Sequence, residues 1–119
     1  MAYVDGIIIP VQKKKLAAYR VMSKKFGKIC REYGALEYHE SVADDVKVGK
    51  RTSFPRSVKL KAGETVVFAW VVYKSRAARD RATAKIMSDK RVPAIMNPKS
   101  AGFDGKRLIY GGFKTFIDL

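Results

Sequence analysis

Asp5 and His39 are the two residues of this sequence whose types best suit acid–base chemistry. Both are ionisable, and their positions in two predicted strands would turn both side chains to the same side of a sheet. A carboxylate that fixes the tautomer of an imidazole makes the histidine a general base near neutral pH. In the alternative, His39 lies partly solvated on an edge strand and has no catalytic role. Asp5 and His39 are therefore the candidate catalytic residues, with no reaction assigned.

Arg107, Phe68 and Trp70 suit a second task, the recognition of a ligand. An arginine holds a carboxylate or phosphate through paired hydrogen bonds, and aromatic rings stack on a planar molecule. In the alternative, Arg107 forms a buried salt bridge with Asp5, and the two aromatic rings are the core of a dimer. The predicted ligand-binding residues are Tyr3, Asp5, Glu37, His39, Phe68, Trp70 and Arg107.

Several reaction classes lack their signatures in this sequence. One histidine and one cysteine far apart do not make a zinc site, so no metal is expected. The glycine patterns of dinucleotide and phosphate loops are missing, as is the G-x-S-x-G pattern of a serine nucleophile, and no cofactor is expected. Cys30 falls on the apolar face of a predicted helix, which favours packing over nucleophilic attack.

Hydrophobic periodicity predicts the elements that position these residues. Strands are expected at residues 2–11, 35–42, 65–74 and 106–118. Helices are expected over 13–33, ending at Gly34, and from a Ser75 cap through Asp89. The order strand, helix, strand, strand, helix, strand predicts one ferredoxin-like α+β domain over residues 1–119, with both helices on one face of an antiparallel sheet.

Three smaller features complete this outline. The polar segment 43–64 is expected to hold a short strand near 56–60, because a structureless loop of this length is unusual in a small domain. Pro93 is expected to begin a helical turn. The pair Gly111 and Gly112 inside the last strand indicates a bulge or a close backbone contact.

The strand from Val66 to Tyr73 is apolar on both faces, unlike a strand with one wet face. Parity along each strand assigns one set to the helices: Val4, Gly6, Ile8, Leu36, Tyr38, Val67, Ala69, Val71, Leu108 and Tyr110, with Glu40 as a misfit. The other set is Tyr3, Asp5, Ile7, Glu37, His39, Ser41, Phe68, Trp70, Val72, Arg107 and Ile109. This second face is too apolar for open water, so a second copy is expected to cover it and to enclose a cavity between the two sheets.

The sequence is strongly basic, with 25 Lys and Arg against 11 Asp and Glu and a formal net charge of +14. Such a charge attracts polyanions, because each phosphate contact releases counterions. The basic residues of the first helix are the candidate surface: Lys13, Arg20, Lys24, Lys28 and Arg31. Those of the second helix are Arg76, Arg79, Arg81 and Lys85. No nucleic-acid motif accompanies them, so non-specific binding or a merely solubilising charge are the alternatives.

The location of the protein is expected to be cytoplasmic. The longest apolar run, Val66 to Tyr73, is too short to cross a bilayer. The N-terminus lacks the basic start of a secretory signal, and the single cysteine cannot form an internal disulfide.

Four segments of the sequence resemble the YbaA-like family, an uncharacterised bacterial family with a domain of unknown function. They are Tyr3-Val4-Asp5-Gly6, Gly34-Ala35-Leu36-Glu37, Arg76 to Asp80 and the glycine-rich stretch from Phe103 to Phe113. The resemblance runs from Tyr3 to Leu119 and implies the dimeric α+β barrel fold, a ferredoxin-like domain paired through its sheet. It implies no activity and no catalytic residue. This chain departs from the family pattern at Glu40-Ser41-Val42, where members commonly read Glu-Cys-Trp, so a thiol there is lacking.

Three functions follow as hypotheses. In the first, a cytoplasmic homodimer binds a small planar or anionic molecule and performs cofactor-free chemistry on it, with Asp5, His39, Trp70 and Arg107 at the site. In the second, the basic helix layer binds RNA or another polyanion. In the third, the dimer is structural and has no ligand.

Overall fold

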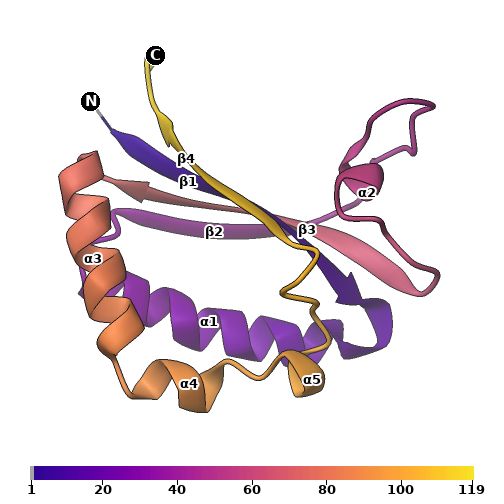
Figure 1. Ribbon diagram of the computed structural model, residues 1–119, viewed down its shortest axis with the longest axis horizontal. Helices are drawn as coiled ribbons and strands as arrows, with labels where there is room; N and C mark the ends of the chain where they lie inside the picture. The colour runs from indigo at the N-terminus through magenta and orange to yellow at the C-terminus, as the bar shows by residue number, and fades with distance from the viewer. Residues whose placement is uncertain (1) are drawn as a thin grey trace.

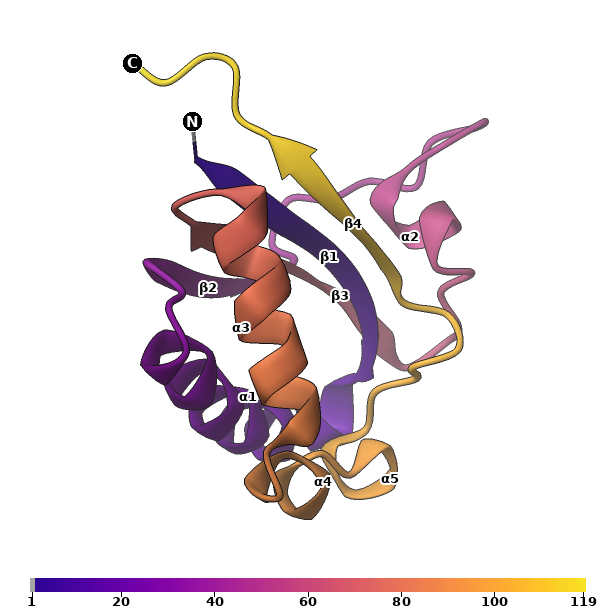
Figure 2. The same cartoon turned by 60° about the vertical axis from the view of Figure 1, so that its left-hand side comes forward.

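The computed structural model describes residues 2–119 and contains a four-stranded antiparallel sheet in the order β2-β3-β1-β4 (Figure 1). The strands are β1 (Tyr3–Gln12), β2 (Glu37–Val42), β3 (Glu64–Tyr73) and β4 (Ile109–Lys114). The two long helices, α1 (Leu16–Glu32) and α3 (Arg76–Ser88), lie on the same side of the sheet in both views (Figures 1 and 2). This is the ferredoxin-like arrangement, and the predicted fold class is confirmed.

The central strands β1 and β3 form the longest pairing, from Tyr3 opposite Tyr73 to Gln12 opposite Glu64. Their β-branched and aromatic residues suit a pleated sheet buried on both sides. Strand β4 pairs with β1 from Ile8 back to Tyr3, so the two chain ends lie side by side (Figure 1).

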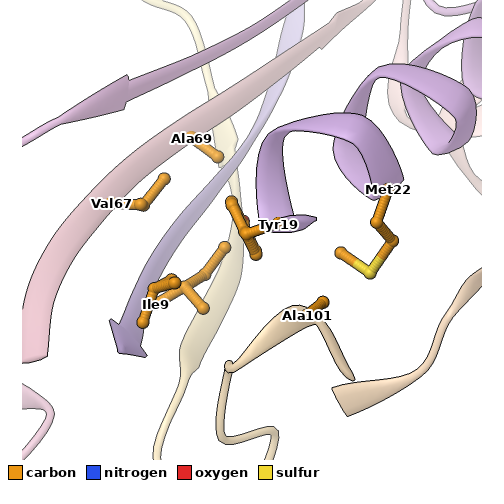
Figure 3. Close-up of a cluster of buried hydrophobic side chains, with 7 residues drawn as sticks. Ile9, Tyr19, Met22, Val67, Ala69 and Ala101 are labelled. Atoms are coloured by element: carbon orange, nitrogen blue, oxygen red, sulfur yellow. The ribbon is translucent and has the colours of Figure 1, made fainter. Parts of the chain in front are cut away.

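Helix α1 follows a 3₁₀ turn, Lys13–Lys15, and lies against the sheet through the apolar face that the sequence predicted. Tyr19 of α1 points toward Ile9, Val67 and Ala69 of the sheet, and Met22 of the same cluster points toward Ala101, as Figure 3 shows. The chain leaves the helix through Gly34 at a φ of 116°, a left-handed conformation that favours glycine. Glycine therefore ends α1 where it was expected.

Helix α3 begins at the predicted cap, because the Ser75 hydroxyl accepts a hydrogen bond from the Ala78 N–H at 3.1 Å. Its inner face buries Ala82 and Ile86. The chain then continues through two short helices, α4 (Arg91–Ile95) and α5 (Pro98–Ala101), which lie beside α1 (Figures 1 and 2). Pro93 lies inside α4 rather than at its start.

The predicted strand near 56–60 is wrong, because this segment contains the short helix α2 (Phe54–Ser57). The Ser53 hydroxyl accepts a hydrogen bond from the Arg56 N–H at 3.0 Å, and Pro55 fits the first turn, where no N–H is needed. Behind α2, Val58 packs on Ile8 and Val66 from the side of the sheet away from α1 and α3 (Figure 2). The segment therefore covers one end of the open face of the sheet.

The predicted bulge at Gly111 and Gly112 is also absent, since within residues 2–119 the pairing of β4 with β1 runs without interruption. The second glycine instead permits a close side-chain approach. A Cβ atom at Gly112 would collide with the Tyr3 hydroxyl and the Arg79 guanidinium.

The predicted face of β1 is wrong by one residue. Asp5 pairs with Val71 and Ile7 with Ala69, and residues paired across antiparallel strands point to the same side. Val71 and Ala69 face the helices, so Tyr3, Asp5 and Ile7 do too, whereas Val4, Gly6 and Ile8 face away. The physical reason is that β1 is covered on both sides, by the helices and by the α2 segment. Its apolar residues therefore do not alternate with polar ones, and the sequence pattern does not show which side of β1 faces the helices.

Candidate functional site

A cavity of about 410 Å³ lies between the sheet and the helix layer, within a single chain. Most of its lining is apolar, with Ile7, Ile9, Ala69 and Val71 from the sheet and Met22, Phe26 and Ile86 from the helices. Its polar side chains come from all four strands and both long helices: Asp5, Tyr19, Ser23, Tyr38, Glu40, Tyr73, Thr83 and Tyr110. An apolar cavity with a few convergent polar groups is the usual form of a small-molecule site.

The carboxylate of Glu40 is held by two tyrosine hydroxyls. Tyr19 donates to Oε1, and Tyr38 donates to Oε2 at 2.5 Å. Burial raises the pKa of both tyrosines, and the adjacent carboxylate raises each further, so both hydroxyls stay protonated and remain donors. Because each carboxylate oxygen can accept more than one hydrogen bond, Glu40 retains acceptor capacity toward the cavity.

The second acidic group of the cavity, Asp5, lies against Arg79 of α3. The Oδ1 of Asp5 is 3.6 Å from the Nε of Arg79, and within residues 2–119 neither atom has a hydrogen-bond partner. Arg79 directs its terminal nitrogens to the hydroxyls of Tyr3 at 3.0 Å and Tyr110 at 3.2 Å. Burial raises the pKa of Asp5, and the Arg79 charge opposes that shift only in part.

The predicted Asp5–His39 pair does not form, because the two residues lie on opposite faces of the sheet. His39 pairs with Trp70 on the open face, while Asp5 faces the helices. The His39 side chain is 47% exposed, and its Nε2 lies 3.1 Å from Glu37 Oε1. An exposed histidine with that neighbour matches the alternative of an edge-strand residue rather than a base held by Asp5.

Arg107 also lies apart from the other predicted site residues, in the turn before β4. It forms a two-pronged ion pair with Glu64, at 2.9 and 2.6 Å, and bonds Asp104 at 2.8 Å. It also donates to the carbonyl oxygens of Val58 and Lys59, and so ties the α2 segment to the sheet. Its guanidinium is occupied by the protein itself, and the predicted Asp5–Arg107 salt bridge is wrong, since Arg79 takes that place.

The aromatic members of the predicted site do come together, on the open face. The rings of His39 and Trp70 stack with centroids 4.8 Å apart, and Phe68 contacts Trp70 edge-on at 5.5 Å. Glu37 lies on the same face through its contact with His39. The predicted set is thus divided among three places: this aromatic group, the buried pair Tyr3 and Asp5, and Arg107 at the end of the sheet.

The remaining predictions concern helices α1 and α3. The predicted basic residues Lys13, in the 3₁₀ turn, and Arg20, Lys24, Lys28 and Arg31 of α1 are all exposed, as expected. Arg79 is not part of an outer basic layer, because its side chain is only 16% exposed. Cys30 is buried in the core, as the packing prediction expected, and burial raises the pKa of its thiol to about 12.

Residues 2–105 match the family described as a protein of unknown function, DUF1428. The chain belongs to this family. The DUF1428 chain is 46% identical over 118 residues to the uncharacterized protein YbaA of Escherichia coli K12, with 99% of each chain covered. The YbaA of Shigella flexneri matches to the same extent. The resemblance found in the sequence is therefore confirmed, and it brings no known activity with it.

Solved structures similar to this DUF1428 protein share its fold at low sequence identity. SnoaB from Streptomyces nogalater, a cofactor-independent oxygenase, has a TM-score of 0.63 at 13% identity, covering 99% of this chain and 96% of SnoaB. A dimeric ferredoxin-like protein from an uncultured marine organism has a TM-score of 0.59 at 10% identity, covering 99% and 96%. These similarities show that the chain shares the ferredoxin-like fold of these proteins.

Glu40, Tyr19 and Arg79 are among the polar residues that the sequence did not predict for the site, together with Tyr38 and Ser23. Glu40 gave a signal, because it was an acid at a strand position that pointed to the helices. Tyr19 appeared only as one member of an apolar helix face, and Arg79 as one of several basic residues.

Within residues 2–119, no helix of this protein is long and apolar enough to cross a membrane.

Proposed function

We propose that this DUF1428 protein binds a small, largely apolar organic molecule in the cavity between its sheet and its helices. The observation that carries the proposal is the cavity itself, about 410 Å³ with an apolar wall and a carboxylate held by two tyrosines. Known ligand sites have volumes of roughly 300–1,000 Å³ and the same mixture of apolar walls and few polar groups. The proposed site therefore lies inside one chain, whereas the sequence led us to expect a cavity between the sheets of two copies.

Glu40 is the group best suited to chemistry on such a ligand. A general base must be fixed within hydrogen-bond reach of the proton that it removes. The hydroxyls of Tyr19 and Tyr38 fix both oxygens of Glu40 at the cavity wall. SnoaB, which shares this fold, is a cofactor-independent oxygenase, and this supports a reaction that uses no cofactor.

The protein is further proposed to be a homodimer through the open face of the sheet. This face exposes large apolar side chains, among them Phe68 at 41%, Ile109 at 44% and Phe113 at 62%. An exposed apolar patch of this kind marks an interface. The similar marine protein is dimeric, which supports a second copy as the partner. The cavity lies on the other side of the sheet, so dimerisation leaves it intact.

The test is a thermal-shift screen of small aromatic and aliphatic metabolites, followed by calorimetry on each compound that binds. Ala69→Met would fill part of the cavity, because Ala69 lies in its wall and is 3% exposed. We expect this variant to weaken binding at least about tenfold, since the added side chain overlaps the ligand. Ala84→Met is the matched control, because Ala84 is exposed on α3 and outside the cavity. Equal binding by a folded Ala69→Met variant would refute the cavity as the site.

The basic surface of α1 supports a second candidate function, the binding of a polyanion. Five exposed basic side chains follow this helix, and the net charge of the chain is +14. Binding of this kind is driven by counterion release and falls steeply with added salt. Retention on heparin, with variants given below, tests this candidate independently of the cavity.

A further inference from the structure

The charged groups that line the cavity are of one sign. Asp5 and Glu40 are the ionisable acids of the wall, and within residues 2–119 the lining includes no lysine, arginine or histidine. Asp5 has a cationic neighbour in Arg79, whereas the hydrogen-bond partners of Glu40 are two neutral hydroxyls. The interior of this strongly basic protein is therefore acidic at its binding site, and Glu40 carries the uncompensated charge.

Glu40 presents the acceptor that a ligand can use. The Oδ1 of Asp5 is buried against Arg79, 3.6 Å from its Nε, so this acid is already paired within the protein. The hydroxyls of Tyr19 and Tyr38 already donate to Glu40, so a ligand that meets this carboxylate must supply a donor of its own.

The two acids are well separated across the sheet. Glu40 is opposite Ala69 and Asp5 is opposite Val71, on the two strands that flank β3. Two strand spacings and one two-residue step place their Cα atoms roughly 12 Å apart. The contact of Asp5 with Arg79 is therefore separate from the Glu40 carboxylate.

The outer surface beside Glu40 has the opposite charge. Tyr19, Ser23, Tyr38 and Glu40 also line a groove on the outer surface between α1 and β2, so they form the boundary between groove and cavity. That groove includes two basic side chains, Arg20 and Lys24. A cation is repelled by these side chains and by the net charge of the chain, and an anion is opposed inside by Glu40.

We infer that the ligand of this cavity is an uncharged hydrogen-bond donor, such as a phenol, rather than an anion or a cation. The inference rests on the proposed function and narrows it, and it replaces the planar or anionic molecule expected from the sequence. A neutral hydroxyl is not repelled by the basic surface and donates to the Glu40 carboxylate, the kind of hydrogen bond that is stronger than one between neutral groups.

Four probes of one shape test the inference by calorimetry on the wild-type protein: naphthalene, 2-naphthol, 2-naphthoate and 2-naphthylmethylammonium. We expect 2-naphthol to bind best, about tenfold or more tighter than naphthalene, because it adds a hydrogen bond to a charged acceptor. Both ions are expected to bind more weakly than 2-naphthol. Tighter binding of either ion, or equal binding of all four, would overturn the inference and leave the cavity proposal standing. If none of the four binds, the cavity proposal fails and takes the inference with it.

Glu40→Gln identifies the residue responsible, since it keeps the shape and removes the charge. It is expected to shift the preference for 2-naphthol over 2-naphthoate by about tenfold toward the anion. Glu37→Gln is the matched control, on the same strand but on the open face and exposed, and it should leave the preference unchanged. An unchanged preference in a folded Glu40→Gln variant would contradict the role of Glu40. The wild-type ranking remains decisive if that variant does not fold.

Discussion

Removal of the Arg107 side chain, as in Arg107→Met, separates a structural role from the ligand-binding role expected from the sequence. Arg107 holds both oxygens of Glu64, at 2.9 and 2.6 Å, and bonds the carbonyl oxygens of Val58 and Lys59. The two charged side chains are only 15% and 10% exposed. The methionine variant would leave Glu64 as a nearly buried carboxylate without its partner.

The expected cost is about 2–3 kcal/mol of unfolding free energy. Loss of one partner of a buried ion pair costs roughly 3–5 kcal/mol, and the lower figure allows for the partial exposure of this pair. Urea unfolding, monitored by far-UV circular dichroism, measures the change in unfolding free energy. The change appears as a lower urea concentration at the unfolding midpoint, with an unchanged dependence of the free energy on urea concentration. Arg76→Met is the matched control, because Arg76 pairs with Asp80 where both side chains are more than half exposed, and little change is expected there. A stability loss at Arg107 no larger than at Arg76 would refute the reasoning.

The same pair predicts a dependence on pH. Arg107 lowers the pKa of Glu64 below its ordinary value, so the stability that this pair contributes is present above that ordinary value. This stability is lost as the pH falls through the lowered pKa of folded Glu64, because protonated Glu64 is neutral and no longer forms an ion pair with Arg107. The difference between wild type and Arg107→Met is therefore expected to be full at pH 7 and to shrink below about pH 4. A difference that stays constant down to pH 2.5 would argue against this ion pair as its source.

Two further predictions concern surfaces. Trp70→Glu on the open face is expected to give a monomer in sedimentation equilibrium, because the dimer would have to bury a charge against the second sheet; an unchanged mass would remove this face from the interface. Lys24→Glu combined with Lys28→Glu is expected to elute from heparin at lower salt than wild type, since both side chains are exposed on α1. The same charge change at Lys50 and Arg51 is the control, and an equal effect there would show that net charge alone matters.

The sequence predicted the order of the elements because the signals for each were local. Helix α1 has an apolar face at helical spacing and a glycine at its end, and Ser75 caps α3 as its type suggested. The segment 43–64 failed for a local reason too. Ser53 and Pro55 are signals for a helix start, but the expectation of a strand was drawn from loop length alone.

The division of the sheet into two faces could not be predicted from strand parity. Parity carries information only where one face of a strand is wet, and β1 is covered on both sides. Ile8 is 8% exposed, as is Ile9, although the two point to opposite faces. Only the register with β3 decides which face Asp5 occupies, and register depends on long-range pairing. The error moved Asp5 to the wrong side and created the pair with His39.

Glu40 shows where a violation of the pattern was itself the evidence for a site. An acid on the helix side of a strand is costly unless hydrogen-bond donors accompany it. Tyr19 and Tyr38 supply those donors, yet the approach of α1 to β2 that brings Tyr19 within reach is not encoded in the spacing of either element. An apolar side chain at position 40 would pack against the same wall without any donor. The chain instead places one carboxylate and two hydroxyls at the boundary between an outer groove and an inner cavity. The free-energy cost of this polar group in a small core supports our proposal that a ligand meets the carboxylate there.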